Sequence, residues 1–213
     1  MNKVNYQREL DKTLERLAVE GKKPSLLLHA CCAPCSSYVL EYLSAYFEIT
    51  LYFYNPNIAP REEYEKRLEE LERLCLEMQE AERLSLPVKI LAGEYEPERF
   101  TRLAQGREEL PEGGERCFAC YALRLGEAAK VAKEGGFDYM TTTLSISPYK
   151  NAEKLNEIGR NLEQQTGVAY LYSDFKKKNG YQRSIALSQE FDLYRQDYCG
   201  CVYSRAEREH NRH

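Results

Sequence analysis

Short apolar segments alternate with longer amphipathic segments along most of the chain. The short segments are rich in Leu, Ile, Val, Tyr and Thr, which predicts β-strands over 25–30, 49–54, 88–92, 137–143 and 168–172. The segments between them repeat apolar residues every three or four positions, which predicts helices over 36–46, 61–84, 117–134, 151–165 and 182–195. Apolar strands that alternate with helices are typical of an α/β fold. We therefore expect a five-stranded parallel sheet with helices on both faces.

We expect these elements to form a single α/β domain over residues 1–213. A chain of this length suits one domain, and no repeat, low-complexity segment or linker divides it. Residues 1–22 are amphipathic and predict an N-terminal helix in front of the first strand. Residues 196–213 predict a C-terminal tail after the last helix, and this tail carries a Cys-Gly-Cys sequence.

The composition indicates the compartment in which the eight cysteines act. No apolar run approaches the ~20 residues that a membrane span needs, and residues 1–22 lack the apolar core of an export signal. We therefore expect a cytoplasmic protein without a membrane partner, in which thiols stay reduced. Cysteines in such a protein indicate metal binding or redox chemistry rather than a disulfide framework. Cys75 is the exception, because it lies in the apolar stripe of the helix at 61–84 and predicts a packed small hydrophobe.

Acidic and basic residues are unevenly distributed along the chain. The net charge is −4, and residues 61–84 alone hold nine acidic and five basic residues, which accounts for it. Residues 174–183 instead hold one acidic residue and four bases, which are Lys176, Lys177, Lys178 and Arg183. Such a patch can bind phosphates, although a run of lysines is also typical of a solvated loop.

The remaining cysteines fall into three groups. Cys31, Cys32 and Cys35 follow the first strand and open a helix, while Cys117 and Cys120 lie at another predicted helix start. Strands of a parallel sheet end at one edge, where ligands bind, and helix N-termini favour thiolates. The two groups therefore predict a four-sulfur site. Its spacing fits Cys32, Cys35, Cys117 and Cys120, and leaves zinc, an iron–sulfur cluster and metal-free redox chemistry open.

The third group is Cys199-Gly200-Cys201. Two sulfurs separated by one residue can close only a small, strained disulfide ring, and strain makes a disulfide easier to reduce. The pair is therefore interpreted as a two-electron store, with further metal ligation as the alternative.

Long motifs around these cysteines resemble the cobalamin-independent epoxyqueuosine reductases. The motifs are HACCAPC (29–35), CFACYALRLGEAA (117–129), FDYMTTTLSISPYKN (137–151), DFKKKNGYQRS (174–184) and LYRQDYCGC (193–201). The resemblance implies an adenine-nucleotide-alpha-hydrolase-like (Rossmann-like) fold, with a [4Fe-4S] cluster, an additional mononuclear iron and no cobalamin. It also implies a reaction. Epoxyqueuosine at the wobble position of a tRNA anticodon would be reduced to queuosine, with electrons from an external donor.

The resemblance also implies roles for individual residues. It places the cluster on Cys31, Cys32, Cys117 and Cys120, and the redox-active pair on Cys199 and Cys201. The resemblance thus names Cys31 as a cluster ligand, whereas the spacing alone indicates Cys35 in its place.

Other residues near the expected sheet edge are weaker candidates. Asp174 and Asp197 could ligate a second iron or deliver a proton, although Asp more often caps local backbone. Ser147, Tyr149 and Lys150 could contact the nucleotide, although turn chemistry around Pro148 also explains them.

Two other classes of protein are alternatives to a reductase. An ATP-using tRNA-modifying enzyme of the same fold needs a phosphate-binding loop after the first strand, where this chain has CCAPCSS without a glycine run. A non-catalytic iron–sulfur or zinc protein for redox or binding would explain the cysteines, but would not need the basic 174–183 segment.

Overall fold

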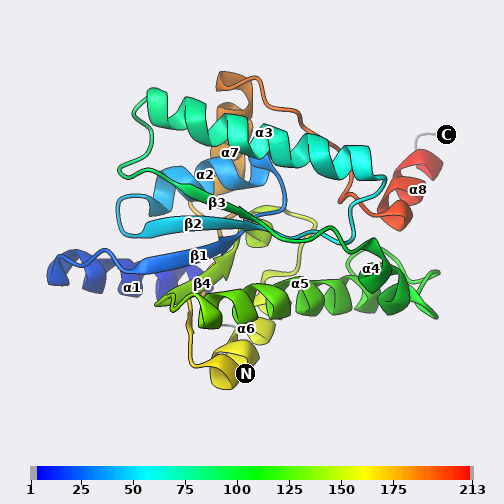
Figure 1. Ribbon diagram of the computed structural model, residues 1–213, viewed down its shortest axis with the longest axis horizontal. Helices are drawn as coiled ribbons and strands as arrows, with labels where there is room; N and C mark the ends of the chain where they lie inside the picture. Colours follow the sequence, from blue (N-terminus) through cyan, green and yellow to red (C-terminus); the bar gives the residue numbers. More distant parts are fainter. Residues whose placement is uncertain (1–3, 212–213) are drawn as a thin grey trace.

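The computed structural model describes residues 4–211, in which helices and strands alternate (Figure 1). In chain order they are α1 Tyr6–Glu20, β1 Ser25–His29, α2 Ala33–Leu43, β2 Glu48–Phe53, α3 Arg61–Glu80, β3 Lys89–Ala92, α4 Pro97–Ala104, α5 Glu115–Glu134, β4 Tyr139–Thr142, the 3-10 turn η1 Thr143–Ile146, α6 Ala152–Thr166, β5 Ala169–Tyr170, α7 Gly180–Glu190 and α8 Val202–His210. The predicted strands and the helices between them are confirmed, with bounds that shift by a few residues.

The strands form one five-stranded sheet in the order β3-β2-β1-β4-β5. Every neighbouring pair is parallel, as predicted. The strand order reverses between β1 and β4, because successive strands run to one side of β1 and then to the other. In open α/β sheets such a reversal leaves a crevice at the carboxyl ends of the two strands, where ligands bind.

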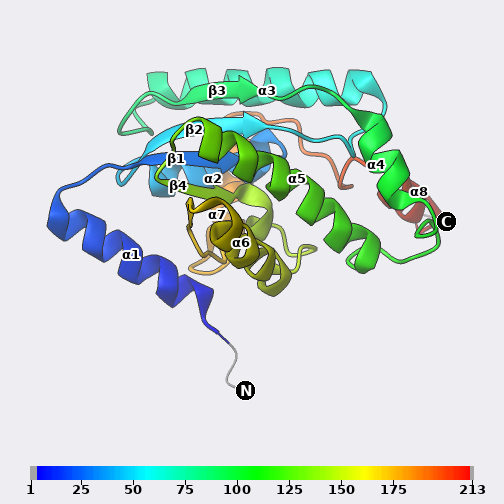
Figure 2. The ribbon, with the colours of Figure 1, turned by 60° about the horizontal axis from the view of Figure 1, so that its bottom comes forward.

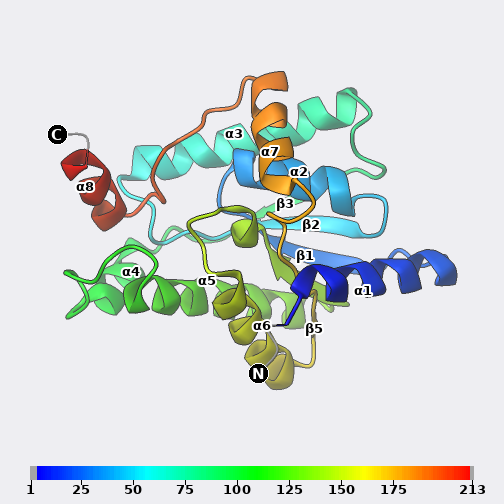
Figure 3. The ribbon, with the colours of Figure 1, turned by 180° about the vertical axis from the view of Figure 1, so that it is seen from behind.

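Helices cover both faces of the sheet. Along β1, Leu26 and Leu28 point into one apolar core and Leu27 points into the other, as the alternation of side chains along a strand requires. Helices α1, α2, α3 and α7 contribute to the first core, while α5 and α6 pack against the opposite face. Figure 2 shows α3 and α5 on opposite sides of the sheet, and Figure 3 shows α7 beside α2.

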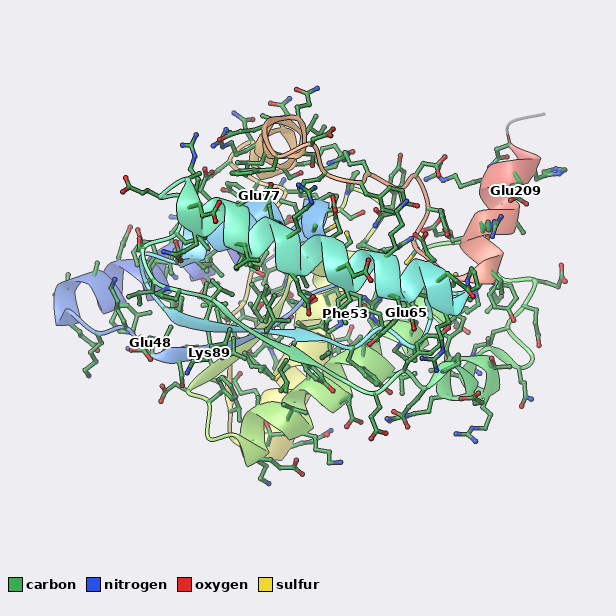
Figure 4. All side chains as sticks on the ribbon, turned by 45° about the horizontal axis from the view of Figure 1, so that its top comes forward. Glu48, Phe53, Glu65, Glu77, Lys89 and Glu209 are labelled. Atoms are coloured by element: carbon green, nitrogen blue, oxygen red, sulfur yellow. The ribbon has the colours of Figure 1, made fainter. Side chains whose placement is uncertain are left out.

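Helix α3 crosses the first face of the sheet above β2 and β3. Figure 4 shows Glu65 and Glu77 along this helix and Phe53 on the strand beneath it. Phe53 and Tyr64 pack with ring centroids 5.0 Å apart, and Cys75 is buried in the same core. Burial raises the pKa of the Cys75 thiol to about 12. The prediction that Cys75 is a packed hydrophobe is confirmed.

The sequence prediction missed two helices at the far end of the molecule. Helix α4 buries only Phe100 and Ala104, and α8 buries only Ser204, so neither has a long apolar stripe to read. The interpretation of 196–213 as a tail after the last helix is therefore wrong, since α8 lies within it. Of the predicted N-terminal helix, residues 4–22 are described and contain α1, while 1–3 and 212–213 lie outside the described residues.

Within residues 4–211, no helix combines the length and the apolar character that crossing a membrane requires.

Candidate metal and redox site

The turn from β1 into α2 brings three sulfurs together. The Sγ atoms of Cys31, Cys32 and Cys35 all lie within 4.8 Å of one another, and those of Cys31 and Cys32 are 3.7 Å apart. Cys32 is the N-cap of α2, and Pro34 fits the first turn because a helix start needs no donor there. Thiolates at this spacing are suitable ligands for a soft metal ion or cluster.

This cysteine turn lies at the point where the strand order reverses. Thr143 follows β4, and its hydroxyl oxygen accepts from the Cys31 amide at 3.4 Å and lies 3.6 Å from Cys31 Sγ. Hydrogen bonds from the thiols of Cys32 and Cys35 hold the pKa of Cys31 well below its usual range. Cys31 is therefore the most acidic thiol of the three.

The second cysteine group opens α5. Cys117 lies in the first turn, where its Sγ accepts from the Gly113 amide at 3.3 Å. Cys120 lies one turn further along and is buried beside Phe100 and Cys201. Burial raises the pKa of the Cys120 thiol to about 11. Cys31 and Cys117 pack against the same apolar cluster around Tyr121, Leu125, Leu144 and Leu155. Among the described residues, however, only Cys31, Cys32 and Cys35 have sulfurs close enough to share one metal ion.

The Cys-Gly-Cys segment opens α8. Cys201 is the N-cap of this helix, and its Sγ accepts from the Ser204 amide at 3.4 Å. Gly200 has φ +114°, a conformation that side chains rarely allow, and this turn places Cys199 and Cys201 on either side of it. Both thiols are free. All three cysteine groups therefore lie at helix N-termini, where the helix dipole favours thiolates.

A cleft of about 350 Å³ lies between these groups. Its wall includes Cys31, Cys32, Cys35 and Cys199. A second, smaller hollow is lined by the sulfurs of Cys117, Cys120, Cys199 and Cys201. Cys199 lines both spaces, so this sulfur faces the first cysteine group on one side and the second on the other.

A buried polar network holds the Cys-Gly-Cys turn. Lys150 Nζ lies 3.2 Å from Glu112, and the Ser204 hydroxyl donates to the other carboxylate oxygen at 3.1 Å. The Ser204 oxygen also accepts from the Cys199 amide at 3.0 Å. Burial lowers the pKa of Lys150, but Cys199 and Glu112 outweigh this and raise it well above its usual value. An ammonium group is thus fixed beside Cys199.

Several residues around Cys199 were not predicted from the sequence. Glu112 and Ser204 line the smaller hollow, and Asn57 Nδ2 lies 4.0 Å from Cys199 Sγ. The sequence did contain a signal for this wall, namely two asparagines directly after a strand. Asn55 and Asn57 follow β2, and both are buried. Buried amides at a strand end need partners, which a ligand site supplies.

His29 is fully buried at the end of β1 and is already engaged. Its ring nitrogens lie 2.9 Å from the Thr142 hydroxyl and 3.1 Å from the Tyr54 carbonyl oxygen. Burial lowers the pKa of His29 to about 3, so the ring stays neutral beneath the cysteines.

The structure divides the other predicted site residues into two sets. Ser147, Tyr149, Lys150 and Asp197 line the large cleft. Asp174 does not line it and instead pairs with Lys176 at 2.7 Å.

The basic residues of 174–183 also lie outside the cleft wall. Lys178 pairs with Asp11 at 2.7 Å, and Arg183 binds both carboxylate oxygens of Glu41. Lys177 is exposed and forms no ion pair among the residues that the structure describes. Most of the positive charge in this segment is therefore already matched within the protein.

The amino-acid sequence matches one known protein family. The model of the family described as epoxyqueuosine reductase QueH matches residues 26–207. The protein of that name from Staphylococcus epidermidis is 44% identical over 204 residues, covering 95% of this chain and 85% of the relative. The one from Streptococcus pyogenes serotype M1 is 43% identical over 202 residues, covering 95% and 78%. The one from Thermotoga maritima is 36% identical over 190 residues, covering 86% and 92%.

Proposed function

The chain belongs to the epoxyqueuosine reductase QueH family, and we propose that it reduces epoxyqueuosine in the wobble position of a tRNA anticodon to queuosine. The epoxide takes up two electrons and two protons, loses its oxygen as water and becomes an alkene. The observation that carries this proposal is the position of seven cysteines at three helix starts, where they line two hollows that share Cys199.

We propose that the first two cysteine groups hold a [4Fe-4S] cluster. Cys31, Cys32, Cys117 and Cys120 are the proposed ligands, and Cys35 competes with Cys31 because its sulfur belongs to the same compact group. The thiol donors suit iron–sulfur ligation, and an additional mononuclear iron would bind near Cys199. When bound, the cluster supplies electrons one at a time, and an iron with an open position polarises oxygen.

We propose that Cys199 and Cys201 store the electron pair. Oxidation of two thiols to one disulfide releases two electrons and two protons, which equals the demand of the epoxide. The Lys150 ammonium beside Cys199 can hold a proton at Nζ and return it to the departing oxygen. An external donor then reduces the disulfide again.

We propose that the nucleotide enters through the aromatic and basic rim of the large cleft. Arg208 stacks over the Tyr149 ring at 4.7 Å, and Arg195 lies 5.9 Å from the ring of Tyr181. These four side chains line the cleft. Proteins that read single-stranded RNA stack unpaired bases on aromatic rings and on guanidinium planes. The rim therefore offers base stacking and phosphate binding around the cysteines.

Anaerobic purification tests the metal assignment. Wild-type protein should contain about four sulfides per chain and reduce the epoxide in tRNA. Cys32→Ser and Cys120→Ser should lose both the sulfide and the activity, while the matched control Cys75→Ser keeps both. A colourless protein with one zinc ion would contradict the iron–sulfur proposal, and would favour the zinc-binding alternative.

A further inference from the structure

Two buried guanidinium groups flank the cysteines from opposite faces of the sheet. Arg67 comes from α3 and Arg124 from α5, which Figure 1 shows above and below the sheet. Their residues are only 2% and 1% exposed. Removing an arginine charge from water costs several kcal/mol unless an anion lies nearby. Each of these groups therefore implies a negative partner inside the protein.

Arg67 lies between the first cysteine group and the Cys-Gly-Cys turn. Its Nε donates to Glu63 at 2.7 Å, and its Nη1 donates to the Cys199 carbonyl oxygen at 3.1 Å. Its Nη2 is buried without a hydrogen-bond partner. Burial lowers the pKa of Arg67, but Cys32 is the strongest of the groups that raise it above its usual value. Arg67 thus lines the large cleft together with the first cysteine group and also fixes the backbone of Cys199.

Arg124 occupies the matching position on α5. Its Nη2 donates to Asn55, and its Nε is buried without a partner. The groups that offset its burial are the thiols of Cys120, Cys199 and Cys31, in that order. Arg124 lies one helical turn after Cys120 on α5, which places its guanidinium on the side of the helix that carries this thiol.

We propose that Arg67 and Arg124 are positioning residues whose fixed charges stabilise the metal-loaded sulfur site and make it accept an electron more readily. This proposal rests on the proposed function. A site built from thiolates is anionic, and each electron that it accepts adds negative charge. Cations buried nearby interact strongly in a medium of low dielectric, so they favour both metal binding and the reduced state. Nη2 of Arg67 and Nε of Arg124 are buried without a hydrogen-bond partner, so neither guanidinium is fully satisfied by the described residues.

Charge-conserving and charge-removing variants separate this role from a purely structural one. Arg67→Gln and Arg124→Gln remove the cation, and Arg67→Lys and Arg124→Lys keep it. The matched control is Arg73→Gln on the same helix as Arg67, where the side chain is 38% exposed and pairs with Glu70 and Glu77.

The measured quantity is the midpoint potential of the bound metal group, obtained from a reductive titration that is monitored by EPR. Each Gln variant should lower the equilibrium constant for reduction at least tenfold, which is 59 mV for one electron. The Lys variants and Arg73→Gln should stay within threefold of wild type. Unchanged potentials in the Gln variants, or equal shifts in the Lys and Gln variants, would overturn the proposal.

The rate of metal release to a chelator is a second measurement, and it applies whichever metal the protein holds. The Gln variants should release metal at least tenfold faster than wild type, and the Lys variants should not. If the wild-type protein holds zinc, the iron–sulfur proposal fails but the same release series still judges the arginines. Equal release rates in wild type and the Gln variants would then reject their role.

Discussion

At the scale of single residues, position decides what each cysteine does. Cys75 and Cys32 are both buried, yet Cys75 lies in the middle of α3 within the apolar core. Cys32 instead caps α2 beside two other sulfurs. The same thiol is a packing group in one place and a ligand candidate in the other, because Cys75 packs among apolar side chains whereas Cys32 lies beside two further sulfurs.

Gly200 provides a prediction at this scale. A Cβ at Gly200 would lie 2.9 Å from Ile58 and 3.0 Å from Arg67, and φ is +114°. Gly200→Ala should therefore destabilise the protein by about 1–3 kcal/mol and sharply reduce turnover, since the turn between the two cysteines cannot form. Urea unfolding and the tRNA assay measure the two effects.

The matched control is a glycine inside a helix. A Cβ at Gly126 of α5 meets nothing within 4 Å, so Gly126→Ala should stabilise the protein by about 0.5–1 kcal/mol and keep its activity. Equal stability of Gly200→Ala and wild type would show that the turn is not constrained.

At the scale of elements, the starts of α2, α5 and α8 meet at one end of the molecule. Helices α2 and α5 are held by large apolar cores, whereas α8 is held by a small cluster around Phe100, Cys120 and Cys201 and by polar contacts. Ser204 joins α8 to Glu112, and Glu207 joins it to Arg116 at 3.4 Å. Few buried apolar contacts hold the element that opens with Cys201, which makes it easier to release than the rest.

Ser204→Ala should loosen α8. The Cys199 amide and a Glu112 oxygen would lose their partner, which costs about 1–3 kcal/mol. Amide exchange in α8 should accelerate by about tenfold or more, while exchange in α5 stays unchanged. The control Glu209→Gln removes an exposed pair with Arg205, worth about 0.3–0.5 kcal/mol. Unaltered exchange in Ser204→Ala would mean that other contacts hold α8.

At the scale of the whole molecule, the strand order sets the position of the large cleft, and the proposed RNA-binding rim surrounds it. Arg195→Gln together with Arg208→Gln should weaken tRNA binding at low salt. The slope of log affinity against log salt should fall by up to about 1.4, the value for two contacts with single-stranded phosphates. Arg183→Gln is the control, because Arg183 already forms an ion pair with Glu41 and lies outside the cleft wall. A larger effect from replacing Lys176, Lys177 and Lys178 by Ala would move the RNA contact to that loop.

Buried tyrosines set the alkaline limit of the whole fold. Burial raises the pKa values of Tyr52, Tyr54, Tyr121 and Tyr170 above the ordinary 10.0. Above pH 10 the unfolded chain therefore releases protons that the folded chain keeps, and stability falls as pH rises. Each tyrosine contributes up to about 1.4 kcal/mol per pH unit.

Urea unfolding between pH 8 and 11 measures this loss. In Tyr170→Phe the free energy of unfolding should fall less steeply with pH, by the contribution of about one proton. The reason is that Tyr170 is buried and phenylalanine has no ionisable group. An identical slope in the variant and in wild type would show that this hydroxyl does not contribute.

The sequence by itself determined the regular elements and the sulfur groups. Apolar runs identified the central strands because β1, β2 and β4 are mostly buried, while the edge strand β3, which is largely exposed, was identified from its short apolar segment alone. The spacing of the cysteines marked the starts of α2 and α5. The motifs HACCAPC and CFACYALRLGEAA also identified the family, since their order and length are specific.

Only the tertiary structure decided which buried arginines lie near the cysteine groups. Arg67 and the Cys199 carbonyl are 132 positions apart, and Arg124 and Asn55 are 69 apart, so no local pattern links them. Helix α8 escaped the sequence analysis because its one buried residue is Ser204. Local periodicity reports which face of an element avoids water, whereas a buried polar contact depends on where the sheet brings two distant segments together.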